Sequence, residues 1–245
     1  MTILFDLQHV SVRYSQVHAL QSLDLQVLKG QRLALIGSNG SGKSTLLRVL
    51  NGLITPQKKP LDGQFSGHRS VDAQVRQAML FQRPYMLRMS AQANVALGLW
   101  LKGVSWSESK ATALKALARV GLSEEAARPA KALSMGQQQR LAFARALAQL
   151  PNVLLLDEPT ASMDPHAKRE VETLMSVFAS SHSEEPMTLI FASHNLGQVK
   201  RLATHVAYLE HGKLLAQLPV EDFFDAPKLR SISPAADAFL KGELG

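Results

Sequence analysis

The feature that most constrains this chain is a glycine-rich run of nine residues between an apolar stretch and a helical pattern. The run reads Gly37-Ser38-Asn39-Gly40-Ser41-Gly42-Lys43-Ser44-Thr45; it follows Arg32–Ile36 and opens a helix predicted from Lys43 to Leu53. Glycines let successive backbone N–H groups curl around a phosphate, and the positive end of the helix dipole favours the same anion. The alternative is a glycine-rich turn with an unrelated lysine, but the strand before it and the helix after it favour a phosphate-binding loop.

Two neighbouring acids end a second apolar stretch, Val153-Leu154-Leu155-Leu156-Asp157-Glu158. An uninterrupted apolar run is typical of a strand buried on both faces of a parallel sheet, and such sheets bind ligands beyond the carboxyl ends of their strands. Asp157 is therefore placed to hold Mg²⁺ through water, and Glu158 to polarise an attacking water. Alone, the two could be solvated acids at a strand end, but the phosphate loop upstream favours the catalytic interpretation.

The composition fits one globular α/β chain. Of 245 residues, 46% are apolar and 6% aromatic, so the core has to come mainly from Leu, Ala and Val, as in helices packed on a parallel sheet. Cysteine is absent, which excludes disulfides and cysteine-bound zinc and fits a reducing compartment. The net charge of +7 is scattered along the chain, which favours a solvated surface over a nucleic-acid patch, and it also suits a protein beside an anionic membrane leaflet.

No stretch approaches the ~18 uninterrupted apolar residues of a membrane-spanning helix. Residues 1–6 lack the basic start of a signal peptide. We therefore expect a cytosolic chain that reaches a membrane only through a partner.

The hydrophobic pattern predicts the order of the main elements. Period-2 alternation over the first ~35 residues indicates half-buried antiparallel strands. From about Pro84 to Leu133 an Ala/Leu-rich helical periodicity indicates an inserted helical subdomain. Uninterrupted apolar strands separated by helices predict a mainly parallel core sheet. The remaining expected elements are polar loops over Thr55–Asp62 and Ser180–Glu185, a helix from Ser134 that stops before Pro151, a helix opened by Asp164-Pro165, and a strand over Thr188–Ala192.

Further motifs resemble those of the ATP-binding cassette (ABC) family. Leu133-Ser134-Met135-Gly136-Gln137-Gln138-Gln139-Arg140 looks like the family's signature sequence, at the family's spacing upstream of the Asp-Glu strand. Gln82 resembles its Q-loop glutamine, Asp164 in Ala161-Ser162-Met163-Asp164 its D-loop, and His194 its switch histidine. Tyr14 resembles the aromatic residue that stacks on adenine. The motifs follow in family order over nearly the whole chain, so the resemblance implies an ABC-type P-loop NTPase.

The resemblance implies an ATPase whose ligands are ATP and Mg²⁺. The implied catalytic residues are Glu158, His194 and Gln82. The implied ATP-binding residues are Tyr14, Gly37, Ser38, Asn39, Gly40, Ser41, Gly42, Lys43, Ser44, Thr45 and Asp157. Four residues are implied to bind the ATP of the opposite subunit: Ser134, Gly136, Gln137 and Asp164. The implied Mg²⁺ ligands are Ser44, Gln82 and Asp157.

Several of these residues have a plainer interpretation. Ser134 could be an ordinary helix cap, Gln82 a surface residue, His194 a structural histidine and Tyr14 a packed tyrosine, but their register along the chain favours the functional interpretation. Met135 departs from the commoner glycine of the signature, whereas Gly136, whose amide has to approach phosphate, is retained. We therefore expect a working site, in which Met135 affects the rate and the tightness of dimer closure.

We expect a single ABC ATPase domain over residues 1–245. Within it, residues 1–83 and 134–220 form a RecA-like core with the antiparallel β-subdomain, residues 84–133 the helical subdomain, and residues 221–245 a short tail that packs on the core.

The resemblance also implies partners. These are a second copy of the chain in a head-to-tail, ATP-bound homodimer, transmembrane permease subunits at the cytoplasmic face of the cell membrane, and an extracytoplasmic solute-binding protein in the complete system; no nucleic acid is implied. We expect the permease to dock between Gln82 and Asn94, with Tyr85, Met86, Leu87 and Met89 as apolar anchors.

Residues Ser193–Ala203 and Phe223–Pro227 are similar to cassettes of oxyanion importers of the tungstate, molybdate or phosphate type. The alternative function is a soluble ABC ATPase that acts on nucleic acid or ribosomes. The short insertion, the single phosphate loop and the missing cysteines argue against it. A non-hydrolysing regulator would need Glu158 or Lys43 replaced, and both are present.

Overall fold

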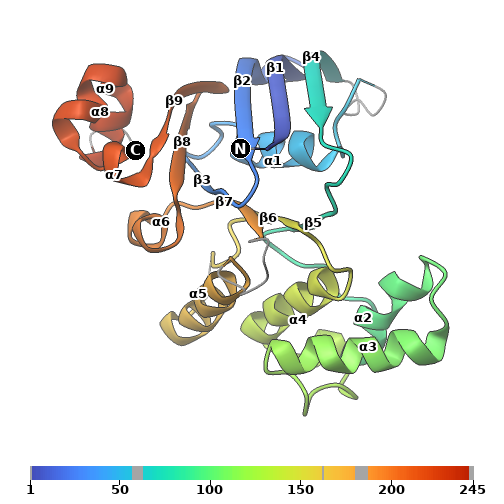
Figure 1. The fold of residues 1–245 in the computed structure, drawn as a ribbon. Coiled ribbons are helices and arrows are strands. Elements are labelled where there is room, and N and C mark those ends of the chain that lie inside the picture. Colours follow the sequence, from blue (N-terminus) through green and yellow to red (C-terminus); the bar gives the residue numbers. More distant parts are fainter. Residues whose placement is uncertain (1, 57–62, 162, 180–186, 243–245) are drawn as a thin grey trace.

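A six-stranded, mainly parallel sheet lies at the centre of the molecule (Figure 1). The computed structural model describes residues 2–56, 63–161, 163–179 and 187–242, and within these ranges the strand order is β5-β6-β7-β3-β8-β9. Neighbouring strands are parallel except β8 and β9, which pair antiparallel. The strands are β3 Arg32–Ile36, β5 Gln77–Leu80, β6 Val153–Asp157, β7 Thr188–Ala192, β8 His205–Glu210 and β9 Lys213–Pro219. β6 and β7 are buried along their whole length. Because neither face of these strands meets solvent, their sequences lack the polar alternation of a half-exposed strand.

A separate antiparallel sheet, with strand order β2-β1-β4, packs beside the central sheet. Its strands are β1 Ile3–Tyr14, β2 Val17–Leu28 and β4 Gly63–Val71. The pairing of β1 shifts between Leu7 and Val10, where His9 has a φ of 51°. This bulge adds one residue, so Leu7 and Val10 both face the core although strict alternation would separate them.

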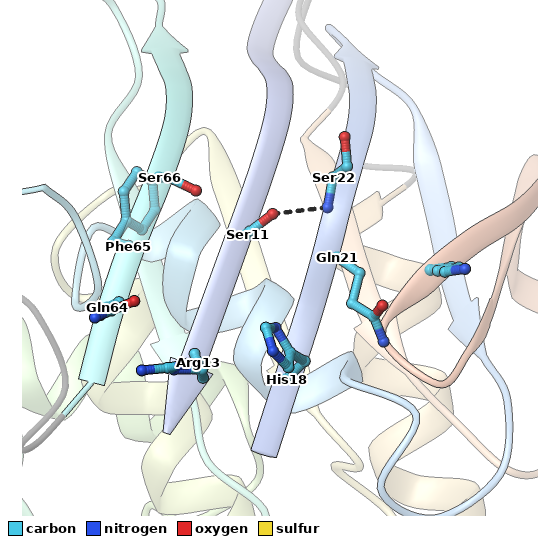
Figure 2. A pocket seen from close by; sticks show the side chains of 9 residues that line it. Ser11, Arg13, His18, Gln21, Ser22, Gln64, Phe65 and Ser66 are labelled. Carbon is cyan, nitrogen blue, oxygen red and sulfur yellow. Dashed lines mark hydrogen bonds between the residues drawn. The ribbon is translucent and has the colours of Figure 1, made fainter. Parts of the chain in front are cut away.

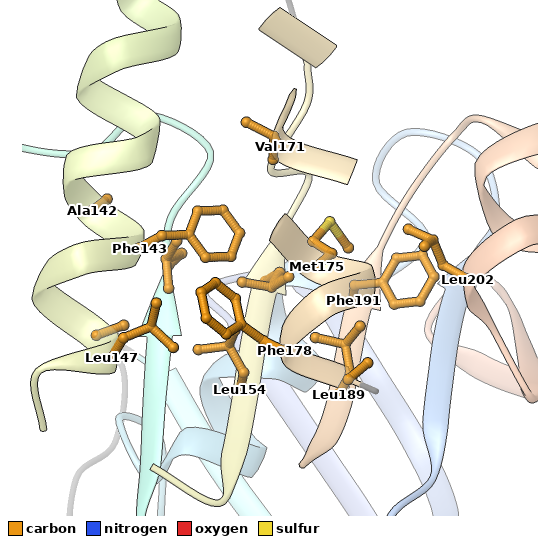
Figure 3. Close-up of a cluster of buried hydrophobic side chains, with 14 of the residues drawn as sticks. Ala142, Phe143, Leu147, Leu154, Val171, Met175, Phe178, Leu189, Phe191 and Leu202 are labelled. Carbon is orange, nitrogen blue, oxygen red and sulfur yellow. The ribbon is translucent and has the colours of Figure 1, made fainter. Parts of the chain in front are cut away.

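Helices cover both faces of the central sheet. On one face α1 (Lys43–Asn51) packs between the two sheets, in one hydrophobic cluster with the inward side of β1 and β2. On the other face lie α4 (Met135–Leu147), α5 (Pro165–Ala179) and α6 (Leu196–Leu202). Figure 3 shows this second cluster, in which Phe143 of α4 and Phe178 of α5 meet Leu154 of β6. Complete burial of each such side chain contributes roughly 1.5–3 kcal/mol.

The helical subdomain projects from the β5 edge of the sheet (Figure 1). It holds α2 (Ala91–Trp100), α3 (Trp106–Arg119) and the 3₁₀ turn η1 (Ala130–Ala132). Ser90 and Ser105 cap the two helices with their hydroxyl oxygens. The buried amide of Asn94 accepts the N–H of Leu87 at 3.0 Å and donates to the carbonyl oxygen of Ser90 at 2.9 Å, which fixes the chain that leads from β5 into α2.

The chain ends in three short helices, α7 (Val220–Phe223), α8 (Ala226–Ile232) and α9 (Pro234–Leu240). Phe223, Leu229 and Ala236 are fully buried in the same cluster as α4 and α5, so this part of the chain packs on the core. Among the helices described, none combines the length and the apolar character needed to cross a bilayer.

The predicted fold class is confirmed, with differences in detail. The helix predicted to reach Leu53 ends at Asn51, because Gly52 takes a left-handed conformation (φ 77°) and its N–H returns to the carbonyl oxygen of Val49. Strands β4, β5, β8 and β9 were not predicted. Ser162 of the predicted D-loop, most of the polar loop after Thr55 and the loop Ser180–Glu185 lie outside the described residues.

Candidate active site

The glycine-rich run turns tightly from β3 into α1, as its sequence predicts. Gly42, just before the helix, has a φ of 106°, which other residues rarely adopt. A Cβ at Gly42 would lie 2.5 Å from the carbonyl oxygen of Ala19, so a larger residue would also push the loop away from β2. Glycine is therefore needed here for both the backbone conformation and the close approach.

Lys43 points its ammonium group back into the loop. Its Nζ donates to the carbonyl oxygens of Gly37 and Ser38, each at 2.9 Å. Burial lowers the pKa of Lys43 from its ordinary value, while the charges of Glu158 and Asp157 oppose that shift. A buried ammonium group that is bonded only to neutral carbonyl oxygens can give up these two bonds and bind an anion such as phosphate instead.

Ser41 adds an unpaired polar atom to the loop. Its Oγ is buried and has no hydrogen-bond partner among the described residues. Buried polar atoms are rarely left unpaired, because an unmade hydrogen bond costs roughly 1–3 kcal/mol. Together with the N–H groups at the start of α1, this hydroxyl fits a loop built to close around a phosphate.

The carboxyl end of β6 meets the first turn of α1. Ser44 donates its hydroxyl to Asp157 Oδ1 at 2.9 Å. Burial raises the pKa of Asp157, and the hydrogen bond from Ser44 opposes the rise. Mg²⁺ in nucleotide sites is usually bound through one or two carboxylates and fills its octahedron with phosphate oxygens and water. This hydroxyl and carboxylate, beside a phosphate loop, fit such an ion.

Glu158 contacts the other two residues predicted to be catalytic. His194 Nε2 lies 2.6 Å from Glu158 Oε1, and the Gln82 amide donates to Glu158 Oε2 at 3.2 Å. Glu158 has a φ of 46°, a conformation that costs a non-glycine residue roughly 1–3 kcal/mol and that tends to occur at functional sites. The structure thus brings together Glu158, His194 and Gln82 from three separate segments.

The pocket beside Glu158 and His194 includes two residues that sequence reasoning missed, Thr160 and Lys168. Thr160 follows Glu158 by two positions, so its closeness in sequence to Glu158 is a signal from which its place in the site could have been predicted. Lys168 lies one turn into α5, where no local pattern distinguishes it from a solvated lysine.

The predicted signature residues form the start of α4. Ser134 Oγ accepts the N–H of Gln137 at 3.3 Å, and Gln137 Oε1 accepts the N–H of Ser134 at 3.0 Å, which is a complete capping box. The Gln137 amide also donates to Glu125 Oε1 at 3.1 Å. Since both ends of the Gln137 side chain are bonded within this chain, the groups left for a ligand are the Ser134 hydroxyl proton and the first backbone N–H groups of the helix.

Gly136 has a packing role that sequence reasoning did not include. A Cβ on Gly136 would lie 2.9 Å from the Cβ of Ala167, so α4 and α5 approach each other closely at this point. Asp164 opens α5 by accepting the N–H groups of His166 and Ala167 at 2.9 and 3.0 Å, and the second of these bonds is the main cause that lowers the pKa of Asp164.

The signature and the D-loop share one pocket. It is lined by Ser134, Met135, Gly136, Gln137, Arg140, Met163, Asp164, His166, Ala167 and Glu170. No residue of the phosphate loop is among them. The structure therefore brings the four residues predicted to act on a neighbouring subunit to one surface, apart from the phosphate loop of their own chain.

The family of this chain follows from its match to a known family model. A family model described as ABC transporter matches residues 20–161. The chain belongs to the ABC transporter family.

Curated ABC relatives match along most of the cassette. It is 36% identical to the glutamine transport ATP-binding protein GlnQ of Escherichia coli, over 86% of this chain and 89% of that protein. It is 38% identical to the nickel import ATP-binding protein NikO of Rhodobacter capsulatus, over 91% of each chain. It is 35% identical to the phosphate import ATP-binding protein PstB 1 of Vibrio cholerae, over 90% of this chain and 85% of that protein.

Solved structures have the same fold. CbiO1 from Clostridium perfringens, part of the ABC transporter complex cbiONQ, superposes with a TM-score of 0.77 at 25% identity, over 98% of this chain and 100% of that one. A dimeric structure of the bacterial ABC transporter cassette MJ0796 gives a TM-score of 0.74 at 26% identity, over 88% and 98% of the two chains. The predicted ABC-type fold, ATP binding and ATPase activity are confirmed, whereas the roles of individual residues stay predictions.

Three other residues of the cassette that are predicted to bind ATP differ from one another in how deeply they are buried. Asn39 is exposed at the tip of the loop, whereas Thr45 is buried in α1. Tyr14 is half-buried at the end of β1 and packs against the cluster of the antiparallel sheet. Tyr14 thus has a packing role in the structure, and adenine stacking remains a prediction.

A further groove lies on the outer face of the antiparallel sheet of this cassette (Figure 2). Figure 2 shows Arg13 and His18 side by side on neighbouring strands, and Ser11 bonded to the N–H of Ser22 at 2.8 Å. Side chains alternate between the faces of a strand, so Arg13 and Tyr14 point to opposite sides of the sheet. The groove is therefore separate from the side on which Tyr14 is predicted to stack on adenine.

Met135 departs from the commoner glycine of the signature, and its side chain is 57% exposed at the signature pocket. We expect Met135→Gly to hydrolyse ATP at the same rate or up to about twofold faster, because the change removes bulk from the surface that is predicted to face the second subunit. Glycine costs a helix roughly 0.5–1 kcal/mol, so a slightly lower Tm is expected as well. Steady-state ATPase kinetics test this; a tenfold loss of kcat with a near-normal Tm would show that the methionine assists closure.

Proposed function

We propose that this cassette powers the import of a small solute through transmembrane permease subunits at the cytoplasmic face of the cell membrane. Two contacts at the mouth of the phosphate loop carry the proposal. Glu158 meets His194 at 2.6 Å, and the preceding residue, Asp157, accepts the hydroxyl of Ser44 at 2.9 Å. The names of the relatives support it, since they describe ATP-binding subunits that import or transport nickel, glutamine and phosphate. They count against the alternative of an ABC ATPase that acts on nucleic acid or ribosomes.

Each residue of the site has a role in the proposed hydrolysis. ATP entry exchanges the two carbonyl partners of Lys43 for phosphate oxygens, while N–H groups of the loop bind the same phosphates. Glu158 orients and polarises the attacking water, and His194 and Gln82 hold its two carboxylate oxygens in place. Mg²⁺, when bound by Ser44, Asp157 and Gln82, supplies positive charge that offsets charge on the phosphates.

A second copy of the chain completes the proposed site. The Ser134 end of α4 and Asp164 share a pocket that contains no residue of their own phosphate loop, so they are free to meet the ATP of a partner. A helix N-terminus favours the negative charge of the γ-phosphate. The proposed assembly is a head-to-tail homodimer that closes on two ATP molecules and opens after hydrolysis. The related cassette MJ0796, whose solved structure is dimeric, supports the pairing of two copies.

The proposed path from the site to the permease runs through the helical subdomain, taken as residues 84–133. Residues 221–245 are taken as a short C-terminal tail. Tyr85 is 72% exposed, and its carbonyl oxygen accepts a 2.6 Å bond from Arg145 of α4. Leu87 and Met89 are partly exposed, whereas Met86 is 4% exposed and belongs to the core. The expectation that Met86 anchors the permease is therefore wrong, because its side chain is already packed within this chain.

The combined change Tyr85→Ala and Leu87→Ala tests the docking surface. We expect permease affinity to fall by at least about tenfold, because central aromatic anchors carry much of the energy of an interface. Basal ATP hydrolysis in the absence of permease is expected to stay within about twofold of normal. The measurement is co-purification with the permease together with solute-stimulated ATPase activity. Leu114→Ala, on the exposed side of α3, is the matched control; unchanged assembly and stimulation in the double variant would refute this docking site.

The finer proposal concerns the solute, which we infer to be an oxyanion such as tungstate, delivered by an extracytoplasmic binding protein. The phosphate-import relative supports it, while the nickel and glutamine relatives have similar identity and support other solutes. Vesicles that contain the cassette and its permease, with the binding protein supplied on the extracytoplasmic side, discriminate between these solutes. ATP-dependent uptake of tungstate, molybdate or phosphate is expected, and uptake of nickel or glutamine instead would replace the oxyanion while leaving the import proposal intact.

A further inference from the structure

One buried amide lies behind the catalytic pair. Gln198, in α6, is fully buried, and its side chain is bonded on both ends. Its Oε1 accepts the hydroxyl of Ser193 at 2.6 Å, and its Nε2 donates to Thr160 Oγ1 at 3.2 Å and to Glu172 Oε1 at 3.3 Å. A polar side chain buried this completely is tolerated because its partners are present, and losing them is costly.

The partners of Gln198 flank the two residues that meet in the site. Ser193 directly precedes His194, and Thr160 follows Glu158 by two positions. Ser193 Oγ also accepts the N–H of Asn195 at 3.0 Å, so the backbone on both sides of His194 is fixed. One amide thus holds the two chain segments that carry the 2.6 Å contact between His194 and Glu158.

The same amide reaches the helix that follows the D-loop. Glu172 lies on α5, is almost fully buried, and pairs with Arg201 of α6 at 2.6 Å. Gln198 is therefore bonded to α5 as well as to the segments that carry Glu158 and His194. A change in the position of α5 when a second subunit binds would pass to the catalytic residues through this contact.

We propose that Gln198 is a positioning residue that holds His194 and Glu158 in register for ATP hydrolysis. It touches neither the nucleotide loop nor the reacting groups, and acts through Ser193 and Thr160. The inference rests on the proposed function of Glu158 and His194. It predicts that removal of the amide slows turnover and leaves nucleotide binding intact, because Lys43 and the phosphate loop have no bond to Gln198 in the described structure.

The first test is Gln198→Leu, which keeps the bulk and removes the hydrogen bonds. We expect kcat for ATP to fall about tenfold, since small misplacements of catalytic groups have large effects on rate, with KM for ATP within about twofold of normal. Gln217→Leu is the control, because it removes an amide that donates to the carbonyl oxygen of Gln26, away from the site. Normal kcat in Gln198→Leu, or equal changes of kcat and KM, would overturn the proposal.

The second test exchanges groups and remains decisive if Gln198→Leu folds poorly. Gln198→Glu alone places a carboxylate about 3.3 Å from Glu172, so kcat is expected to fall at least about tenfold. Adding Glu172→Gln swaps amide and carboxylate, restores a donor–acceptor pair and keeps one negative charge, so kcat is expected to return to within about threefold of normal. Failure of the exchange to restore kcat overturns the positioning role. If the unmodified chain itself fails to hydrolyse ATP, the proposed function is at fault instead.

Discussion

Lys43→Ala is expected to weaken ATP binding by at least about 100-fold. The lysine supplies the one buried ammonium group inside the described phosphate loop, where it donates two 2.9 Å hydrogen bonds to carbonyl oxygens that phosphate would replace. Charge-assisted hydrogen bonds are worth roughly 1.5–3 kcal/mol each, and a loss of about 2.7 kcal/mol already corresponds to 100-fold in Kd. Equilibrium binding of ATP measures the effect.

Lys115→Ala is the matched control for Lys43→Ala, because Lys115 is exposed on α3. A near-normal Tm is needed as well, since the alanine variant leaves the carbonyl oxygens of Gly37 and Ser38 without their donor. ATP binding within about threefold of normal in a folded Lys43→Ala protein would show that the ammonium group is not a phosphate ligand.

Glu158→Gln is expected to lower ATP turnover by about 10²–10⁴-fold, the usual contribution of a general base. Glutamine keeps the size of the side chain and can still accept a hydrogen bond, but it is a far weaker base. Because hydrolysis is what opens the dimer in the proposed cycle, ATP should hold two copies together in this variant. Steady-state kinetics measure the turnover, and size-exclusion chromatography with light scattering, with and without ATP, measures the dimer.

Glu124→Gln is the control for Glu158→Gln, because Glu124 is an exposed acid of the helical subdomain. Turnover near the normal rate in Glu158→Gln would remove Glu158 from the reaction. Low turnover without an ATP-dependent dimer would leave Glu158 as the base and reject hydrolysis as the step that opens the dimer.

Elements with strong local signals were predictable from sequence. β6 and β7 have uninterrupted apolar sequences because helices cover both faces of the sheet, and no surface helix produces that pattern. The helix starts at Ser134 and Asp164 were predicted from capping chemistry, which depends on the next three residues. The phosphate loop was predicted because glycine, lysine and serine occur at fixed offsets between a strand and a helix.

Features set by distant contacts were not predictable. β4 was missed because Phe65 is its single buried hydrophobic residue, so the strand lacks an apolar alternation. Met86 was predicted to be a surface anchor because it lies in an apolar group with Tyr85, Leu87 and Met89, but its own side chain enters the core. Gly136 is needed against Ala167, and Gln198 bonds to Thr160 and Glu172, residues 38 and 26 positions away. Single-sequence patterns carry no signal of such pairings.

The central claim is that two copies of this chain share each ATP between the phosphate loop of one copy and the Ser134 end of α4 of the other. The most direct test is the rate of ATP hydrolysis per subunit at saturating ATP as a function of protein concentration, with the oligomeric state measured in the same samples. The account predicts that the rate per subunit rises with concentration as monomers pair. Measurable hydrolysis at a constant rate per subunit, over a range in which the protein stays monomeric, would contradict it.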